Sequence, residues 1–266
     1  MDLATIIGLI LAWGAVFAAL MIEGGKPAEL ANLSAFILVI FGTAGATIIS
    51  VSLEQILALP GVMRKAFFAH RTDMSAITKT VVDFARKARQ EGVLALESEC
   101  ATLENKFLKK GMQLIIDGTP SELVREVLET EIVAMQERHK AGENIFATAG
   151  GFAPTLGIIG TVMGLVNMLA RLDEPGKMGP AIASAFIATL YGVGLANLLF
   201  LPIGSKLKAR TTDEVVTYEM IIEGVLSIQA GETPRIVEMK MMAFLSPKLR
   251  DKAANETEKR EMDRAA

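Results

Sequence analysis

Four long stretches of this 266-residue sequence contain no charged side chain. They cover residues 3–22, 30–53, 144–170 and 178–205, and they are 20, 24, 27 and 28 residues long. A helix of about 20 apolar residues is long enough to cross the roughly 30 Å hydrocarbon layer of a bilayer. The mean hydropathy of the whole chain, +0.40, is also high for a soluble domain. The sequence therefore predicts an all-α membrane protein whose four transmembrane helices lie in a lipid bilayer.

The positions of lysine and arginine predict the orientation of these helices, because basic residues near a membrane span are retained on the cytoplasmic side. The two connections 23–29 and 171–177 are short and together hold three basic residues. The remaining flanks hold eight, namely Arg64, Lys65, Arg71, Arg138, Lys140, Lys206, Lys208 and Arg210. Both termini of this multi-pass protein are therefore expected in the cytoplasm.

This orientation divides the chain into five parts. Residues 1–53 are predicted to form transmembrane helices 1 and 2, and residues 144–205 to form transmembrane helices 3 and 4. Residues 54–143 form a large helical cytoplasmic domain, and residues 206–245 add further cytoplasmic helices. Residues 246–266 are charged and poor in apolar side chains, which predicts a disordered cytoplasmic tail.

The predicted cytoplasmic domain contains an amphipathic pattern. Apolar residues recur at a helical period from Ile77 to Ala88, and charged residues occupy the opposite face. Gly92 is well placed to end this helix. A second helix is expected to follow, and its inward-facing residues are Leu96, Cys100, Leu103 and Phe107.

Local signals predict three more cytoplasmic helix segments. Residues 119–122, which read Thr-Pro-Ser-Glu, form a capping box with proline at the first helical position, and the helix that they begin can continue into the third span. A comparable helix is expected to leave the fourth span and to end near Gln229. Thr233 and Pro234 then begin a short helix that runs through Met242.

Composition argues against several functional classes. The formal net charge of −3 gives no basic attraction to nucleic acid, so we expect no nucleic-acid partner. One cysteine and two histidines supply neither an internal disulfide nor a His/Cys metal site. The cytoplasmic helices hold no recognisable nucleophile with an adjacent base and no phosphate-binding glycine loop. We therefore expect no enzyme, no resident metal and no cofactor.

The four predicted spans also lack the side chains that usually carry ions. No Asp, Glu, Lys, Arg or His lies within them, although carboxylates inside the membrane are the usual carriers of protons or sodium. If ions cross the membrane here, the carboxylate belongs to another chain. The third span instead holds small residues at four-residue spacing, Gly157 with Thr161 and Gly160 with Gly164, a pattern that lets helices pack closely.

Two prolines and two threonines in these spans have more than one interpretation. Pro154 and Pro202 each remove a backbone donor, which distorts a helix and is consistent with a gate. The hydroxyls of Thr161 and Thr189 either bond to the carbonyl one turn earlier or face a lumen and contribute oxygen to an ion. Spacing alone does not decide between these alternatives.

Three segments of the sequence resemble the MotA/PomA family of flagellar motor stators. They are residues 152–164 (FAPTLGIIGTVMG), 188–192 (ATLYG) and 224–238 (GVLSIQAGETPRIVE), and the resemblance extends over nearly the whole chain. The first segment is shared with the distantly related ExbB and TolQ subunits, whereas the third segment and the four-span layout are more specific to the stators. Residues 86–99 are similar to the charged segment of the family that engages the rotor.

The resemblance implies an oligomeric assembly with a partner subunit, a transported ion and a location in the cell. A homo-oligomeric ring, a pentamer in the family, would surround two copies of a single-span MotB/PomB-type subunit whose aspartate binds the transported H⁺ or Na⁺. The bacterial cytoplasmic (inner) membrane would hold this complex. Ion flow would rotate the ring and drive the rotor switch protein FliG.

The resemblance also implies roles for individual residues. The ion pathway would contain Pro154, Thr155, Thr161, Thr189 and Pro202, and its prolines would couple ion binding to conformational change. Arg89 and Glu97 would be the principal rotor contacts, in one patch with Arg86, Lys87 and Glu99. Gly157, Gly160 and Gly164 would pack helices together.

The choice of ion and the class of machine each leave an alternative. Sodium-driven members carry threonine at the positions of Thr161 and Thr189, and hydroxyl oxygens suit a partly dehydrated Na⁺, so we expect Na⁺ to bind transiently near this pair in preference to H⁺. An ExbB/TolQ-type energiser of outer-membrane transport is the main alternative function, and a secondary transporter is another. The charges of residues 86–99 would, without a rotor, be an ordinary solvated surface.

Overall fold

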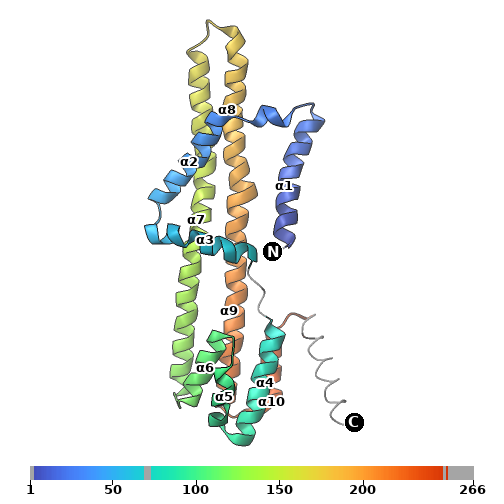
Figure 1. Cartoon of the computed structure of the whole chain (residues 1–266), viewed down its shortest axis with the longest axis vertical. Helices are drawn as coiled ribbons and strands as arrows, with labels where there is room; N and C mark the ends of the chain where they lie inside the picture. Colours follow the sequence, from blue (N-terminus) through green and yellow to red (C-terminus); the bar gives the residue numbers. More distant parts are fainter. Residues whose placement is uncertain (1–2, 69–72, 248–249, 251–266) are drawn as a thin grey trace. The chain divides into compact units, whose positions relative to one another are not determined.

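The computed structural model describes residues 3–68, 73–247 and 250. Within these residues all regular structure is helical, which confirms the predicted all-α fold (Figure 1). The chain divides into two compact units, of which unit 1 comprises Met1–Ala69 and Arg138–Arg210 and unit 2 comprises His70–Glu137 and Thr211–Ala266. Arg71 and nearly all of the tail predicted to be disordered lie outside the described residues.

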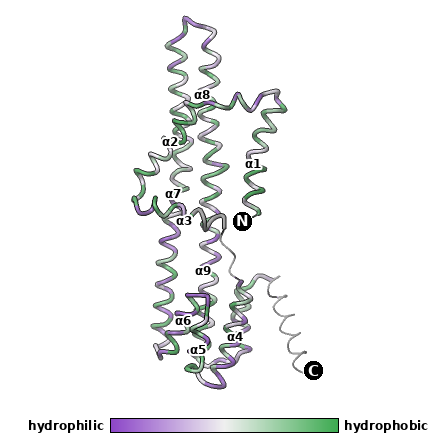
Figure 2. The backbone as a smooth tube through the Cα atoms, viewed as in Figure 1, coloured by the Kyte–Doolittle hydropathy of each residue, from purple (hydrophilic) through white to green (hydrophobic). Residues whose placement is uncertain are grey.

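Three helical stretches are long and apolar enough to cross a membrane. The first is α1 (Leu3–Ile22), none of whose side chains is buried within the chain. The second is α7 (Ser121–Leu169), which continues through the third predicted span. The third joins α8 (Pro175–Leu195), η3 (Ala196–Phe200) and α9 (Leu201–Gln229) without interruption. Figure 2 shows the hydrophobic colour that covers α1.

The second predicted span is shorter than expected. The charge-free stretch 30–53 yields α2 (Leu33–Ile49), whose 17 residues extend about 25 Å and lie at the lower limit for crossing a bilayer. The Asn32 side chain accepts a hydrogen bond from the Ala35 amide at 3.0 Å, and this cap begins the helix after the short turn η1 (Pro27–Leu30). The next helix, α3 (Leu53–Phe68), was not predicted.

Unit 2 begins with α4 (Met74–Glu91), which confirms the amphipathic helix predicted from periodicity. Asp73 caps it by accepting hydrogen bonds from the amides of Ser75 and Ala76 at 3.0 and 3.2 Å. The buried face consists of Ile77, Thr78, Val81, Phe84 and Ala85. Gly92 ends the helix with φ +86°, a conformation in which a side chain would be strained, as its predicted role requires.

The prediction of one continuous second helix after Gly92 was wrong. The chain instead forms η2 (Val93–Leu96), α5 (Glu97–Ala101) and α6 (Lys106–Ile116). The break falls before Asn105, whose side chain accepts a hydrogen bond from the Leu108 amide at 3.0 Å and begins a new helix. The predicted inward residues Leu96, Cys100 and Phe107 are nevertheless buried.

The end of the chain follows its sequence signals. Helix α9 ends at Gln229, Gly231 has φ +68°, and α10 (Pro234–Ala243) begins at the N-cap Thr233, all as predicted. Helices α4, α6, α7, α9 and α10 enclose one apolar core. Its largest fully buried side chains include Leu96, Leu108, Met112, Leu128, Met220, Ile221 and Met241.

Candidate functional site

Helices α7 and α8 of unit 1 are in close contact along the small residues predicted to pack helices. A Cβ atom placed on Gly157 would lie 2.9 Å from the Ala188 carbonyl oxygen, and one on Gly164 would lie 2.7 Å from the Ala185 Cβ. Gly160 faces Ala188 in the same way. Only residues without a side chain, or with a methyl group, allow two helices to approach this closely.

Two threonine hydroxyls meet within this helix contact. Thr161 on α7 and Thr189 on α8 are hydrogen-bonded to each other, and both side chains are half-buried. The Thr161 Oγ1 also lies 3.0 Å from the Ala185 carbonyl oxygen and 3.2 Å from the Gly157 carbonyl oxygen. The Thr189 Oγ1 lies 3.3 Å from the same Gly157 oxygen. Two hydroxyls and two carbonyls thus place four oxygen atoms together, and oxygen is the ligand that hard cations prefer.

The other predicted pathway residues do not join this oxygen cluster. Thr155 is exposed, and its hydroxyl donates to the Phe152 carbonyl at 2.7 Å in the same helix. Pro154 is half-buried in α7, which continues through it. Pro202 is exposed near the start of α9.

Pro202 lies two residues after a local change in helix type. The five residues of η3, immediately before α9, form a π-helical turn, in which carbonyls pair five residues along the chain instead of four. Because proline has no amide hydrogen, it cannot complete the α-helical bond to residue 198. The wider turn is where α8 and α9 accommodate this missing donor.

Sequence reasoning missed several polar contacts of unit 1. The Asn32 amide group donates to the Ser184 hydroxyl at 2.7 Å, and the Tyr191 hydroxyl donates to the Leu30 carbonyl. These two bonds connect the start of α2 and η1 to α8. The available signal was the presence of polar side chains within or beside otherwise apolar stretches.

The predicted rotor patch lies in unit 2, on α4 and α5, and two of its members pair with each other. Lys87 Nζ lies 2.7 Å from Glu99 Oε1, and this hydrogen bond raises the pKa of the Lys87 ammonium group. Arg86 pairs with Asp83 one turn earlier at 2.9 Å. Three of the five predicted rotor residues are therefore engaged within the chain.

The two principal rotor residues are arranged differently. Arg89 and Glu97 are both exposed, and neither forms an ion pair with any residue in the described part of the chain. Arg89 lies in the last turn of α4 and Glu97 in the first turn of α5, on opposite sides of the Gly92 turn. One cation and one anion are thus available for an external partner.

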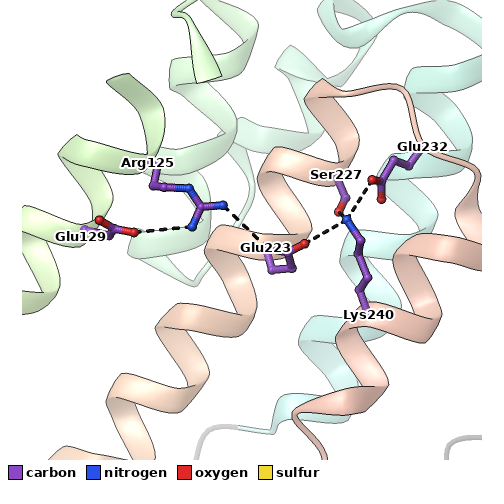
Figure 3. Close-up of polar contacts among 6 residues, drawn as sticks. All are labelled: Arg125, Glu129, Glu223, Ser227, Glu232 and Lys240. Atoms are coloured by element: carbon purple, nitrogen blue, oxygen red, sulfur yellow. Dashed lines mark hydrogen bonds and ion pairs between the residues drawn. The ribbon is translucent and has the colours of Figure 1, made fainter. Parts of the chain in front are cut away.

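A second charged group ties α10 to α9 in unit 2. Lys240 Nζ lies 2.9 Å from a Glu223 carboxylate oxygen, 2.8 Å from one of Glu232 and 3.2 Å from the Ser227 hydroxyl (Figure 3). The hydrogen bond to Lys240 lowers the pKa of Glu232, and the bonds to both carboxylates raise the pKa of Lys240. This cluster fixes the segment 224–238 that was singled out in the sequence.

Comparison with known proteins gives consistent results. The profile of the MotA/TolQ/ExbB proton channel family matches residues 99–220. Motility protein A of Bacillus subtilis is 36% identical over 97% of this chain and 96% of its own length. Chemotaxis protein PomA of Vibrio alginolyticus is 35% identical over 92% of this chain and 96% of its own length.

Among solved structures, the flagellar MotAB stator complex of Bacillus subtilis contains a similar chain. The two chains superpose with a TM-score of 0.88 at 36% sequence identity, over 93% of this chain and 97% of the other. Identity and coverage of this extent, in sequence and in structure, establish more than a shared fold. The chain therefore belongs to the MotA/PomA family, within the wider MotA/TolQ/ExbB proton channel family.

Proposed function

We propose that this chain is the ion-conducting A subunit of a bacterial flagellar stator, which couples the flow of H⁺ or Na⁺ to torque on the rotor. The proposal is supported by the names of its relatives, which are motility proteins, and by its similarity to a chain of a stator complex. Three helical stretches long and apolar enough to span a bilayer are consistent with an inner-membrane location.

One observation carries the proposal. The four charge-free stretches of this chain contain no Asp, Glu, Lys, Arg or His, yet α7 and α8 gather four oxygen atoms at Thr161 and Thr189. Such a site can contribute neutral ligands to a cation, but it supplies no negative charge to balance the charge of that cation. A single-span MotB/PomB-type subunit that provides an aspartate would complete it.

The assembly follows from the same proposal. Four spans place both termini in the cytoplasm, with α2 as the second span and residues 54–143 and 206–245 on the cytoplasmic side. Five copies form a ring around the partner's helices, and ion passage rotates the ring. Pro154 and Pro202 transmit the change to the cytoplasmic part, where Arg89 and Glu97 act on the switch protein FliG.

For the transported ion we favour Na⁺. Hydroxyl and carbonyl oxygens are good ligands for a partly dehydrated metal cation, whereas a proton needs only the partner's carboxylate. The hydroxyls of Thr161 and Thr189 meet each other, and do not only bond within their own helices. Their meeting supports the interpretation that they contribute oxygen to a bound Na⁺.

The test is motility in cells that express this chain and its cognate single-span partner as the sole stator. Swimming speed at fixed pH should rise with external Na⁺. The variant Thr189→Val removes one ligand oxygen without changing the side-chain shape, and it should raise the Na⁺ concentration for half-maximal speed about tenfold, equivalent to roughly 1.4 kcal/mol.

A matched control is Thr47→Val in α2, where the lost hydroxyl donates to the Thr43 carbonyl one turn earlier in the same helix, at 2.7 Å. This variant should leave the Na⁺ dependence unchanged. Swimming that does not respond to Na⁺ would refute the sodium preference and leave a proton-driven stator. Absence of rotation, with the chain and its partner present in the membrane, would refute the stator function itself.

A further inference from the structure

Unit 2 exposes an apolar ridge on α7. Leu123, Val127 and Ala134 are separated by four and seven residues, so they lie on one face of the helix. Leu123 is 49% and Val127 37% exposed, and Ala134 is also exposed. We call these three residues the α7 ridge. The buried face of the same segment, which includes Val124 and Leu128, points elsewhere, into the core.

A second ridge of the same kind lies on α10. Ile236, Met239 and Ala243 are separated by three and four residues and are all exposed, Ile236 to 42% and Met239 to 62%. These three residues are the α10 ridge. The opposite face of α10 is buried through Val237 and Met241.

Helix α9 lies between the helices that bear the two ridges. Its Glu223 contacts Arg125 of α7 at 3.9 Å and Lys240 of α10 at 2.9 Å, through opposite sides of the carboxylate (Figure 3). Helix α9 therefore separates the α7 ridge from the α10 ridge, and both ridges stay exposed within one chain.

The charges beside the ridges are complementary. Glu122 and Glu126 flank the α7 ridge and border a groove of about 740 Å³, which α7 and α9 line together with Lys240 of α10. Arg235 and Lys240 flank the α10 ridge on its two sides. Glu122, Glu126 and Arg235 are exposed, and none of them forms an ion pair with another residue in the ranges that the structure describes.

We propose that the α10 ridge of one copy of this chain packs on the α7 ridge of the next copy, with Arg235 opposite Glu122 and Glu126. A closed ring of identical subunits uses a heterologous contact, in which two different faces of each subunit complement each other. Two apolar ridges with opposite flanking charges, on two different helices of one unit, meet this requirement. The inference rests on the ring assembly proposed above.

The test uses the complete complex in membranes, with Val127→Cys and Met239→Cys combined in one chain and a short bis-maleimide as cross-linker. Both positions are exposed, whereas the native Cys100 is 1% exposed and burial raises its pKa, so Cys100 should not react. The double variant should give a ladder of linked copies. Each single variant should give none, because a heterologous contact brings two different positions together.

Charge reversal provides a second measurement on the same variant. Adding Arg235→Glu places like charges opposite each other and should reduce the cross-linked fraction about tenfold. Adding Glu122→Arg and Glu126→Arg as well should restore it. Loss without restoration would overturn the assigned charge pairing and with it the proposed contact.

The remaining outcomes separate this contact from the ring itself. No ladder, in a complex whose mass measured by light scattering corresponds to several copies, would overturn the contact and leave the stator assembly intact. A linked dimer in either single variant would overturn it in favour of a symmetric contact. A single copy per complex would overturn the ring assembly and this contact together.

Discussion

At the scale of single residues, the charges on α4 and α5 have two different roles. Lys87 and Glu99 bind each other across the Gly92 turn, so they hold the two helices in register. Arg89 and Glu97 have no such partner among the described residues and face outward. Their types could be read from the sequence, but their pairing could not, because it depends on how the chain turns at Gly92 and on the unpredicted short helix α5.

A charge swap distinguishes these roles. Lys87→Glu alone should reduce motility, since it places two carboxylates together, and Lys87→Glu with Glu99→Lys should restore it because the pair is re-formed within the chain. Arg89→Glu and Glu97→Lys should each abolish most torque, and combining them should not restore it. Swimming in soft agar measures the motility of each variant, and immunoblots of the membrane fraction measure its amount in the membrane.

The opposite pattern would contradict the assignment. Full motility of both the Arg89→Glu and the Glu97→Lys variants would mean that these side chains do not contact the rotor. A failed rescue by the double swap at Lys87 and Glu99 would mean that this pair acts outward as well.

At the scale of helices, most elements follow from local signals and the exceptions have identifiable causes. The period of apolar residues predicted α4, and Thr233 with Pro234 predicted α10, because both depend on neighbouring residues along the chain. The late start of α2 was not predicted, since it depends on Asn32, whose side chain caps the helix while it bonds to Ser184 on α8. The convergence of Thr161 with Thr189 likewise depends on a contact between distant segments.

The close approach of α7 and α8 predicts an unequal response to two glycine substitutions. Gly157→Ala places a methyl group against the backbone of α8 and should destabilise the protein by about 1–3 kcal/mol. Gly151→Ala, in the same helix but with nothing within 4 Å of the added carbon, should be neutral or stabilise by up to about 1 kcal/mol. Thermal unfolding of the purified protein in detergent compares the two. Equal midpoints would show that the α7–α8 contact adapts at little cost.

At the scale of the whole molecule, the two units differ in where their apolar side chains lie. Unit 2 has an extensive buried core, whereas α1 in unit 1 exposes its apolar side chains, as expected for a surface that faces lipid or another subunit. The alternation of charge-free and charged stretches predicted this separation. The ends of the charge-free stretches, at residues 144 and 205, differ from the unit boundaries at Arg138 and Arg210, because both helices continue without a break from one unit into the other.

The Lys240 cluster predicts a dependence of stability on pH. Glu232 has a lowered pKa in the folded protein, so its contribution is complete above the ordinary glutamate pKa, about 4.3, and is lost as the pH falls through the lowered folded value. Glu232→Gln should therefore cost about 0.5–1 kcal/mol at neutral pH and nothing in strong acid. Unfolding midpoints across this range measure the difference. Glu104→Gln, an exposed control, should leave the unfolding midpoint unchanged at neutral pH and in acid. A decrease in the midpoint of Glu232→Gln that is the same at every pH would contradict the ion-pair explanation.

The π-helical turn before Pro202 has a consequence for how this protein can vary in length. A wide turn contains one residue more than a regular α-helix needs to span the same rise. Loss of one residue within 196–200 can thus be absorbed by tightening that turn, so that everything beyond it keeps its orientation. The same loss elsewhere in α8 or α9 would rotate the rest of the helix by about 100°, and it would displace every contact that the later residues of α9 make.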